Sequence, residues 1–186
     1  TEEQASPNID FLTTGNNNTS CGTGSLSNVT TGSWNTSVGR KSLYFNTSGY
    51  NNSAFGWNAA RVCSEGHNNI AIGTSALGGN NTGIDISKNT VIGSQSLFNI
   101  DEGCNDNIAI GYRAVYDSLT TGTSNIVIGN EASVGQNNTN SNNQIILGHN
   151  TEGQGDNSVT LGNSDITDIY MSQDSDASIH CGEVLC

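Results

Sequence analysis

The carboxylates and histidines are the side chains of this sequence that could do chemistry, and they form no catalytic or metal-binding pattern. His67, His149 and His180 have no Cys or His partner at ligand spacing, so we expect no metal and no cofactor. A glycan hydrolase would need two carboxylates facing each other across a groove. Candidates for such a pair lie between the expected strands, at Asp85, Asp101, Glu102, Asp106 and Asp117. Because most acidic residues on a β surface only solvate it, we predict no enzyme and no catalytic residue.

Composition limits the class of protein. The chain has 186 residues and a formal charge of −12, with 23 Gly and 28 Asn. This length allows one domain, and the scarcity of Lys and Arg argues against nucleic acid and against polybasic membrane contact. No apolar run reaches the length of about 18 residues that a transmembrane helix needs, so we expect no membrane insertion.

An internal repeat organises the positions of all these residues. The phrase Asn-x-small-apolar-Gly occurs as NIAIG at 69–73 and 107–111, NTVIG at 89–93 and NIVIG at 125–129, with five degenerate copies. The nine copies end at a closing glycine, namely Gly22, Gly39, Gly56, Gly73, Gly93, Gly111, Gly129, Gly148 and Gly162. Most steps between these glycines are 17 to 20 residues, which is too short for an independent core, so the copies must stack as a solenoid.

Each copy predicts a strand of about five residues, a turn, a second short strand at the phrase (S/A)-(L/A/V), and a polar turn. The fold class is therefore all-β, a parallel β-roll or solenoid of about nine coils. At about 4.8 Å per coil, the nine coils make a rod roughly 40 Å long.

Columns of equivalent residues show which faces are apolar. The residue before each closing glycine is apolar, and we predict that this column is the core, with Cys21 as an inert buried thiol within it. The core column comprises Val38, Phe55, Ile72, Ile92, Ile110, Ile128, Leu147 and Leu161. The opposite strand face carries small aliphatic residues such as Ala54 and Ala71. A thin roll can bury only one face, so the other must meet another chain, and a homotrimer around a common axis is the simplest closed arrangement.

Two polar features accompany these columns. Asn18, Asn35, Asn52, Asn69, Asn89, Asn107 and Asn125 share one position and predict a hydrogen-bonded ladder along the stack, the alternative being that they only serve turns. Cys181 and Cys186 are candidates for an interchain disulfide. The alternative to the expectation of no metal is an ion bound on the three-fold axis by one His180 from each chain.

The stretches NTSGYNNSAFGWNAA, HNNIAIGTSAL and NDNIAIGYRAV resemble the repeats of trimeric autotransporter adhesin heads and, more closely, of viral tail-fibre and bacterial trimeric fibre proteins. The resemblance covers residues 13–170. It implies a left-handed parallel β-roll, three chains side by side, an extracellular location on a virion fibre or cell surface, and attachment to a host, prey or other cell. The longer, uneven coils depart from the 14-residue period of adhesin heads.

The tail LGNSDITDIYMSQDSDASIHCGEVLC resembles the stretch that precedes a C-terminal intramolecular chaperone in such fibres. The implied organisation is an N-terminal extension at 1–12, a β-roll at 13–165 and a trimeric tail at 166–186. The chaperone itself is absent from this chain, so its role as a partner in the precursor is an implication of the resemblance.

Aromatic and cationic residues that follow the closing glycines or flank the strands are the candidates for receptor binding, the alternative being that they cap the roll or line the interfaces between chains. Aromatic rings with a polar tip suit contact with a glycan or a protein. The candidates are Trp57, Tyr112, Arg113, Arg40, Trp34 and Tyr50. The alternatives are a purely structural shaft with recognition elsewhere and, third, a glycan-degrading enzyme.

Overall fold

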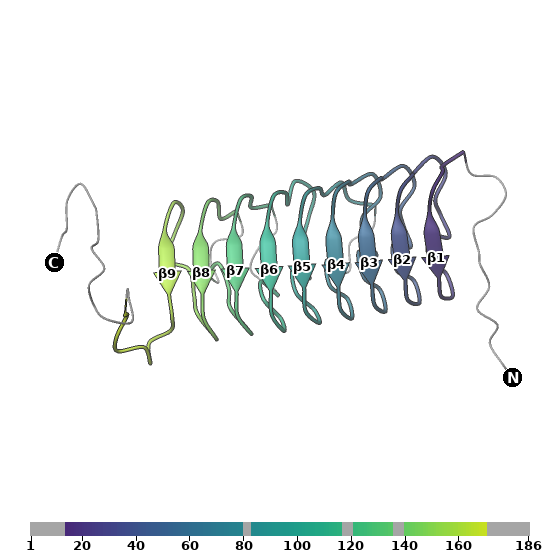
Figure 1. The fold of residues 1–186 in the computed structure, drawn as a ribbon. Coiled ribbons are helices and arrows are strands. Elements are labelled where there is room, and N and C mark those ends of the chain that lie inside the picture. The colour runs from purple at the N-terminus through teal and green to yellow at the C-terminus, as the bar shows by residue number, and fades with distance from the viewer. Residues whose placement is uncertain (1–13, 80–82, 117–120, 136–139, 171–186) are drawn as a thin grey trace, which may run out of the picture.

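A computed structural model describes residues 14–79, 83–116, 121–135 and 140–170. Within these ranges the chain is all-β, with no helix, and forms a parallel β-solenoid of about eight turns. The strands are β1 Thr19–Cys21, β2 Thr36–Val38, β3 Ser53–Phe55, β4 Ile70–Ile72, β5 Thr90–Ile92, β6 Ile108–Ile110, β7 Ile126–Ile128, β8 Ile145–Leu147 and β9 Val159–Leu161. They lie side by side in chain order, from purple to yellow in Figure 1, and the connecting loops extend beyond both ends of each strand.

The predicted register is confirmed at every pair of strands. Thr36 of β2 pairs with Ser53 of β3, and Ser53 pairs with Ile70 of β4, so equivalent positions of successive copies lie directly above one another. The insertion that lengthens the step to Gly93 does not disturb this register, because Ile70 still pairs with Thr90 of β5. The extra residues are therefore accommodated outside the sheet.

The second predicted strand of each coil is wrong. The phrase (S/A)-(L/A/V) forms a turn, in which Leu26, Leu43 and Leu97 adopt left-handed backbone angles with φ of 49°, 47° and 46°. These turns still bond from coil to coil, as in the 2.9 Å bond from Leu43 N–H to Ala59 O. The chain must bend repeatedly to close so short a coil, and left-handed residues interrupt an extended strand. The strands themselves have three residues instead of five.

Glycine is required where each copy ends. Gly111 has a φ of 136°, and a Cβ placed on it would lie 2.4 Å from the carbonyl oxygen of Gly129 in the next coil. The same stacking of glycine on glycine recurs from Gly22 onward. Both the backbone angle and the close approach to the next coil exclude a side chain at this position.

The two faces of each strand are buried and exposed in the opposite sense to the prediction. The small strand residues, Ala54 and Ala71 among them, are fully buried, whereas the predicted core column faces outward. Phe55 is 41% exposed and Ile72 is 40% exposed. The prediction of a buried core column is corrected for its eight residues, which are exposed or partly exposed: Val38, Phe55, Ile72, Ile92, Ile110, Ile128, Leu147 and Leu161. Cys21 belongs to the same column, and its thiol is exposed instead of buried.

The size of the interior explains the reversal. Buried leucines of the turns, such as Leu43, Leu77 and Leu97, point into the coil and fill most of it. A narrow interior packed to protein density then leaves most strands room only for a small residue such as Ser, Ala or Val on the inner face, the larger exception being Ile146 of β8. Larger strand residues must point away from the coil. At the amino-terminal end the interior is polar, because Ser25 Oγ donates a 2.7 Å hydrogen bond to Ser37 Oγ.

The asparagine ladder is confirmed. Asn89 Oδ1 accepts the backbone N–H of Asn107 at 3.0 Å, and Asn89 Nδ2 donates to Asn69 Oδ1 at 3.2 Å and to Cys104 O at 2.8 Å. Equivalent bonds join each member from Asn18 to Asn125, and six of the seven have no more than 1% exposure, Asn18 being the partly exposed one. The ladder therefore satisfies buried amides inside the coil. It ends at Gln144, whose buried side-chain amide has no hydrogen-bond partner among the described residues.

Candidate binding surfaces

The predicted receptor-binding residues occupy two opposite edges of the sheet. Trp57 and Tyr112 directly follow closing glycines and are both 47% exposed, and Arg40 occupies the same position one coil before Trp57. Trp34 and Tyr50 lie at the other end of the strands, before β2 and β3. The two edges are separated by a strand and its flanking residues, about 15 Å at the rise of a β-strand. The structure thus provides two exposed edges and does not bring the candidates into one site.

The carboxyl-side edge holds cations over aromatic rings. Lys41 Nζ lies 5.5 Å from the centroid of the Tyr44 ring, and the Arg61 guanidinium lies 4.8 Å from that of Phe45. Tyr44 and Phe45 are themselves in an edge-to-face contact at 4.9 Å. Sequence reasoning missed Lys41, Phe45 and Arg61. Arg61 stands five residues after its closing glycine, as Tyr44 does one coil earlier, and this shared spacing could have revealed Arg61.

A second cation–aromatic group lies further along the same edge. The Arg113 guanidinium is 4.1 Å from the centroid of the Tyr116 ring, which stacks on Phe98 at 5.3 Å. A hydrogen bond to Tyr116 raises the pKa of Arg113 above its ordinary value, with the charge of Glu131 contributing in the same direction. Arg113 therefore stays cationic but has a carboxylate in its neighbourhood.

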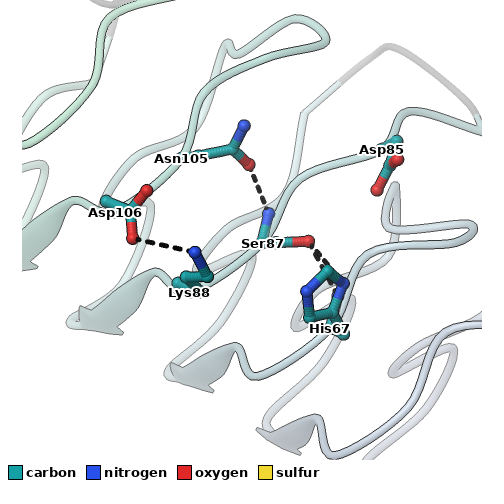
Figure 2. A pocket seen from close by; sticks show the side chains of 6 residues that line it. All are labelled: His67, Asp85, Ser87, Lys88, Asn105 and Asp106. Carbon is teal, nitrogen blue, oxygen red and sulfur yellow. Dashed lines mark hydrogen bonds and ion pairs between the residues drawn. The ribbon is translucent and has the colours of Figure 1, made fainter.

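A shallow pocket of about 240 Å³ opens at the amino-side edge, where β4, β5 and β6 begin. Figure 2 shows the side chains that line it, His67, Asp85, Ser87, Lys88, Asn105 and Asp106. The lining includes the imidazole, hydroxyl and carboxylate that a hydrolase would use. No hydrogen bond or ion pair joins the Asp85 carboxylate to the other five side chains, and Asp106 pairs with Lys88 at 3.7 Å.

The Ser87–His67 contact in this pocket is one rung of a second polar ladder. Ser87 Oγ lies 2.9 Å from His67 Nδ1 and accepts the His67 backbone N–H at 3.0 Å. The position two residues before the ladder asparagine makes the equivalent bond in other coils: Ser33 Oγ accepts the Asn16 N–H, and Asn105 Oδ1 accepts the Ser87 N–H. Because the geometry recurs in coils without a histidine, the contact is explained by stacking and does not indicate a nucleophile and its base.

The remaining chemical candidates do not form a site. Asp85 and Asp106 line the pocket, but Asp101 and Glu102 do not, and Asp117 lies outside the described residues. In the described ranges no three His, Cys, Asp or Glu side chains come close enough to hold a metal ion. Cys181, Cys186 and His180 also lie outside these ranges.

Two buried thiols belong to the core and not to a site. Burial raises the pKa of both the Cys63 and the Cys104 thiol to about 12. Each sulfur accepts a long contact from a ladder asparagine, Asn69 and Asn107 respectively. They are packing residues, because a neutral buried thiol behaves as a small hydrophobe.

An apolar stripe runs along the outer face of the sheet. It consists of the first and third residues of every strand, from Thr19 and Cys21 to Val159 and Leu161. None of these positions holds a charged residue, in a chain whose formal charge is −12. From β3 onward the stripe is built largely of Ile, Leu, Val and Phe, and many of them are close to 40% exposed.

Comparison with known proteins finds no matching family model, no similar curated protein and no similar solved structure. The described part of the chain also has no helix of the length and apolarity needed to cross a bilayer. The repeat, the apolar stripe and the exposed edges are therefore the features that bear on function.

Proposed function

We propose that the chain is a segment of a homotrimeric extracellular fibre that attaches to the surface of a host, prey or other cell. The observation that carries this proposal is the uncharged apolar stripe on the outer face of the strands. Large exposed apolar patches are uncommon on monomeric proteins and mark interaction surfaces. In this proposal the solenoid is left-handed and three chains lie in parallel around one axis.

Further copies of the same chain are the occupants that best fit the stripe. Its two columns extend through all nine strands, a length of roughly 40 Å at about 4.8 Å per strand. A partner must be equally straight, equally long and uncharged, and the stripe of a parallel copy has these properties in register. Rotation about an axis along the rod closes the arrangement without leaving an open face.

Attachment is supported by the resemblance to trimeric fibre proteins and by the exposed aromatic edges. A trimer would present three copies of each aromatic edge on one rigid rod. Simultaneous contact of these copies with a repetitive cell surface would raise the avidity even if each single site bound weakly. The chaperone that such fibres carry would belong to the precursor. The separation of the candidate residues onto two edges favours the second function, a structural shaft whose recognition site lies elsewhere in the parent protein.

Sedimentation equilibrium of the whole chain tests the assembly. We expect a mass of three chains at micromolar concentration and dissociation of the Ile72→Glu/Ile128→Glu variant, which places charge in the stripe. The control is Thr74→Glu/Asn130→Glu, which adds the same charge at two exposed positions outside the stripe. A wild-type mass of one chain would contradict the trimer.

Cell and glycan binding test the attachment. We expect the trimer to bind a panel of cells or an array of surface glycans under avid conditions, and the dissociated variant to bind far more weakly. Trimers that bind nothing in either assay would favour the shaft.

A further inference from the structure

Cationic and acidic side chains are segregated along the rod. Residues 14–64 contain Arg40, Lys41 and Arg61 and no Asp or Glu. The described residues from Glu65 onward contain ten carboxylates against two cations, Lys88 and Arg113. A local positive region therefore exists on a strongly acidic chain.

The three cations gather with aromatic residues on one edge, around the turns that follow β2 and β3. We call this set the basic-aromatic patch: Arg40, Lys41, Tyr44, Phe45, Trp57 and Arg61. Lys41 and Arg61 are held over the Tyr44 and Phe45 rings, which fixes both charges without neutralising them. Among the residues that the structure describes, the single ion pair is Lys88–Asp106, so no described carboxylate pairs with the patch.

Trp57 and Arg40 complete the patch as an exposed pair. They stand at the same position of adjacent coils, directly after Gly56 and Gly39, and the Asn58 N–H donates to Arg40 O at 3.0 Å. Adjacent coils are about 4.8 Å apart, so the backbone positions that carry the indole and the guanidinium are neighbours along the rod. An indole offers its face to the apolar side of a sugar ring, and a guanidinium binds a carboxylate through two parallel hydrogen bonds.

We infer that the basic-aromatic patch binds the terminal acidic sugar of a surface glycan, with the sugar ring on Trp57 and its carboxylate between Arg40 and Lys41. The inference rests on the proposed attachment function and names its ligand class. A terminal residue fits better than an extended polyanion, because the acidic remainder of the rod repels negative charge beyond the patch. The same repulsion makes single-stranded nucleic acid the less favoured partner, although its bases could also stack on Trp57.

Matched oligosaccharides on an array test the ligand class. The pairs end in glucuronic acid or glucose, and in galacturonic acid or galactose, so that each pair differs only in a carboxylate. The full-length wild-type chain should prefer the acidic member by about ten-fold or more, on the order of one charge-assisted hydrogen bond. Raising NaCl from about 50 to 500 mM should reduce this preference, since the patch is exposed. Equal binding of both members would overturn the inference.

Variants locate the site. Arg40→Gln/Lys41→Gln should abolish the preference for the acidic sugar, and Trp57→Ala should weaken both members of each pair. Lys88→Gln removes a cation outside the patch and should leave the preference intact. Sedimentation mass and thermal unfolding check that each variant keeps the assembly of the wild type. A preference that survives the double substitution, or tighter binding of a poly-dT oligonucleotide than of any acidic sugar, would also overturn the inference.

Competition on cells separates this inference from the proposed function. Glucuronic acid–terminated oligosaccharide should displace the fibre from cells that it binds, whereas the glucose-terminated control should not. Cell binding that the acidic sugar does not displace would leave attachment standing and overturn the acidic-sugar site. Absence of cell binding together with absence of array binding would overturn both.

Discussion

Asn107 places two hydrogen bonds on the single side-chain oxygen of Asn89, one from its backbone N–H at 3.0 Å and one from Nδ2 at 3.3 Å. Asn89 does the same to Asn69 at 3.0 and 3.2 Å. Each oxygen thus accepts both bonds from the next coil, and each amide nitrogen also reaches a carbonyl across the interior. The ladder is a continuous network inside the coil, so the loss of one member removes hydrogen bonds from buried groups in both adjacent coils.

Asn89→Ala should destabilise the protein by about 3 kcal/mol, because Asn69 Oδ1, Cys104 O and both donors of Asn107 lose partners at a buried position. For a chain of this size we expect the thermal midpoint to fall by roughly 5–10 °C, as measured by circular dichroism. Asn130→Ala is the control, because the exposed Asn130 side chain has a single hydrogen bond among the described residues, in which its Oδ1 accepts the Tyr112 N–H. Equal losses for the two variants would contradict the role of the ladder.

Replacement of Gln144 by Asn should stabilise the protein. The Gln144 amide is fully buried, with no partner in the part of the chain that the structure describes, and a shorter side chain would place its amide where the ladder asparagines have theirs. We expect a gain of about 1 kcal/mol, the usual net contribution of a recovered hydrogen bond. Gln144→Leu removes the polar group without extending the ladder. If that variant gains as much as Gln144→Asn, relief of desolvation explains the effect and the ladder does not.

Gly111→Ala and Gly155→Ala separate backbone strain from steric stacking. The two glycines have nearly the same φ, 136° and 140°, but a Cβ on Gly111 would meet Gly129 O, whereas nothing lies within 4 Å of one on Gly155. Each substitution should cost about 1–3 kcal/mol from φ alone. Gly111→Ala should cost at least about 2 kcal/mol more, or prevent folding, because a backbone carbonyl cannot move aside. Denaturant unfolding measures the difference, and similar values would show that stacking contributes little.

Cys63 and Cys104 should resist alkylation in the native state. A rise in pKa from 9.0 to about 12 lowers the thiolate population at pH 8 by about a thousandfold. Iodoacetamide labelling followed by peptide mass spectrometry should modify both only after unfolding. Labelling of either thiol at the rate of a free cysteine would contradict its burial.

The same two thiols predict a pH dependence of stability. Their folded pKa is raised above the unfolded value, so their contribution is complete below about pH 9 and is lost as the pH rises toward 12. The Cys63→Ala/Cys104→Ala variant should lose less stability than the wild type between pH 8 and pH 10.5. Identical pH profiles would contradict this assignment.

The stacking of the chain could be predicted from the sequence because it depends on position alone. Each closing glycine marks the end of a strand, as Gly111 does for β6, and the asparagine four residues earlier marks the ladder. The direction of the side chains could not be predicted in the same way. Both faces of β6 are apolar, with Ile108 and Ile110 on one side and Ala109 on the other. An alternation of polar and apolar residues therefore does not indicate which face points into the coil. The volume that Leu97 and its equivalents occupy inside the coil decides it.

The exposed edges were partly predictable. Trp57 and Arg40 are conspicuous in the sequence, but Lys41 and Arg61 gain their meaning only from the turn that places them over Tyr44 and Phe45. The amino-side pocket was not predictable, because its lining comes from three coils and varies in residue type from one coil to the next.

The in-phase register of β1 to β4 has a consequence for inheritance. Three successive steps of 17 residues present the same backbone, the same glycine contact and the same asparagine to the coil on either side. A gene that gains or loses one whole copy therefore makes a longer or shorter rod whose new junction is identical to the old ones. Length can vary by recombination between copies while these backbone, glycine and asparagine contacts are retained, so the length of the rod can evolve independently of its fold.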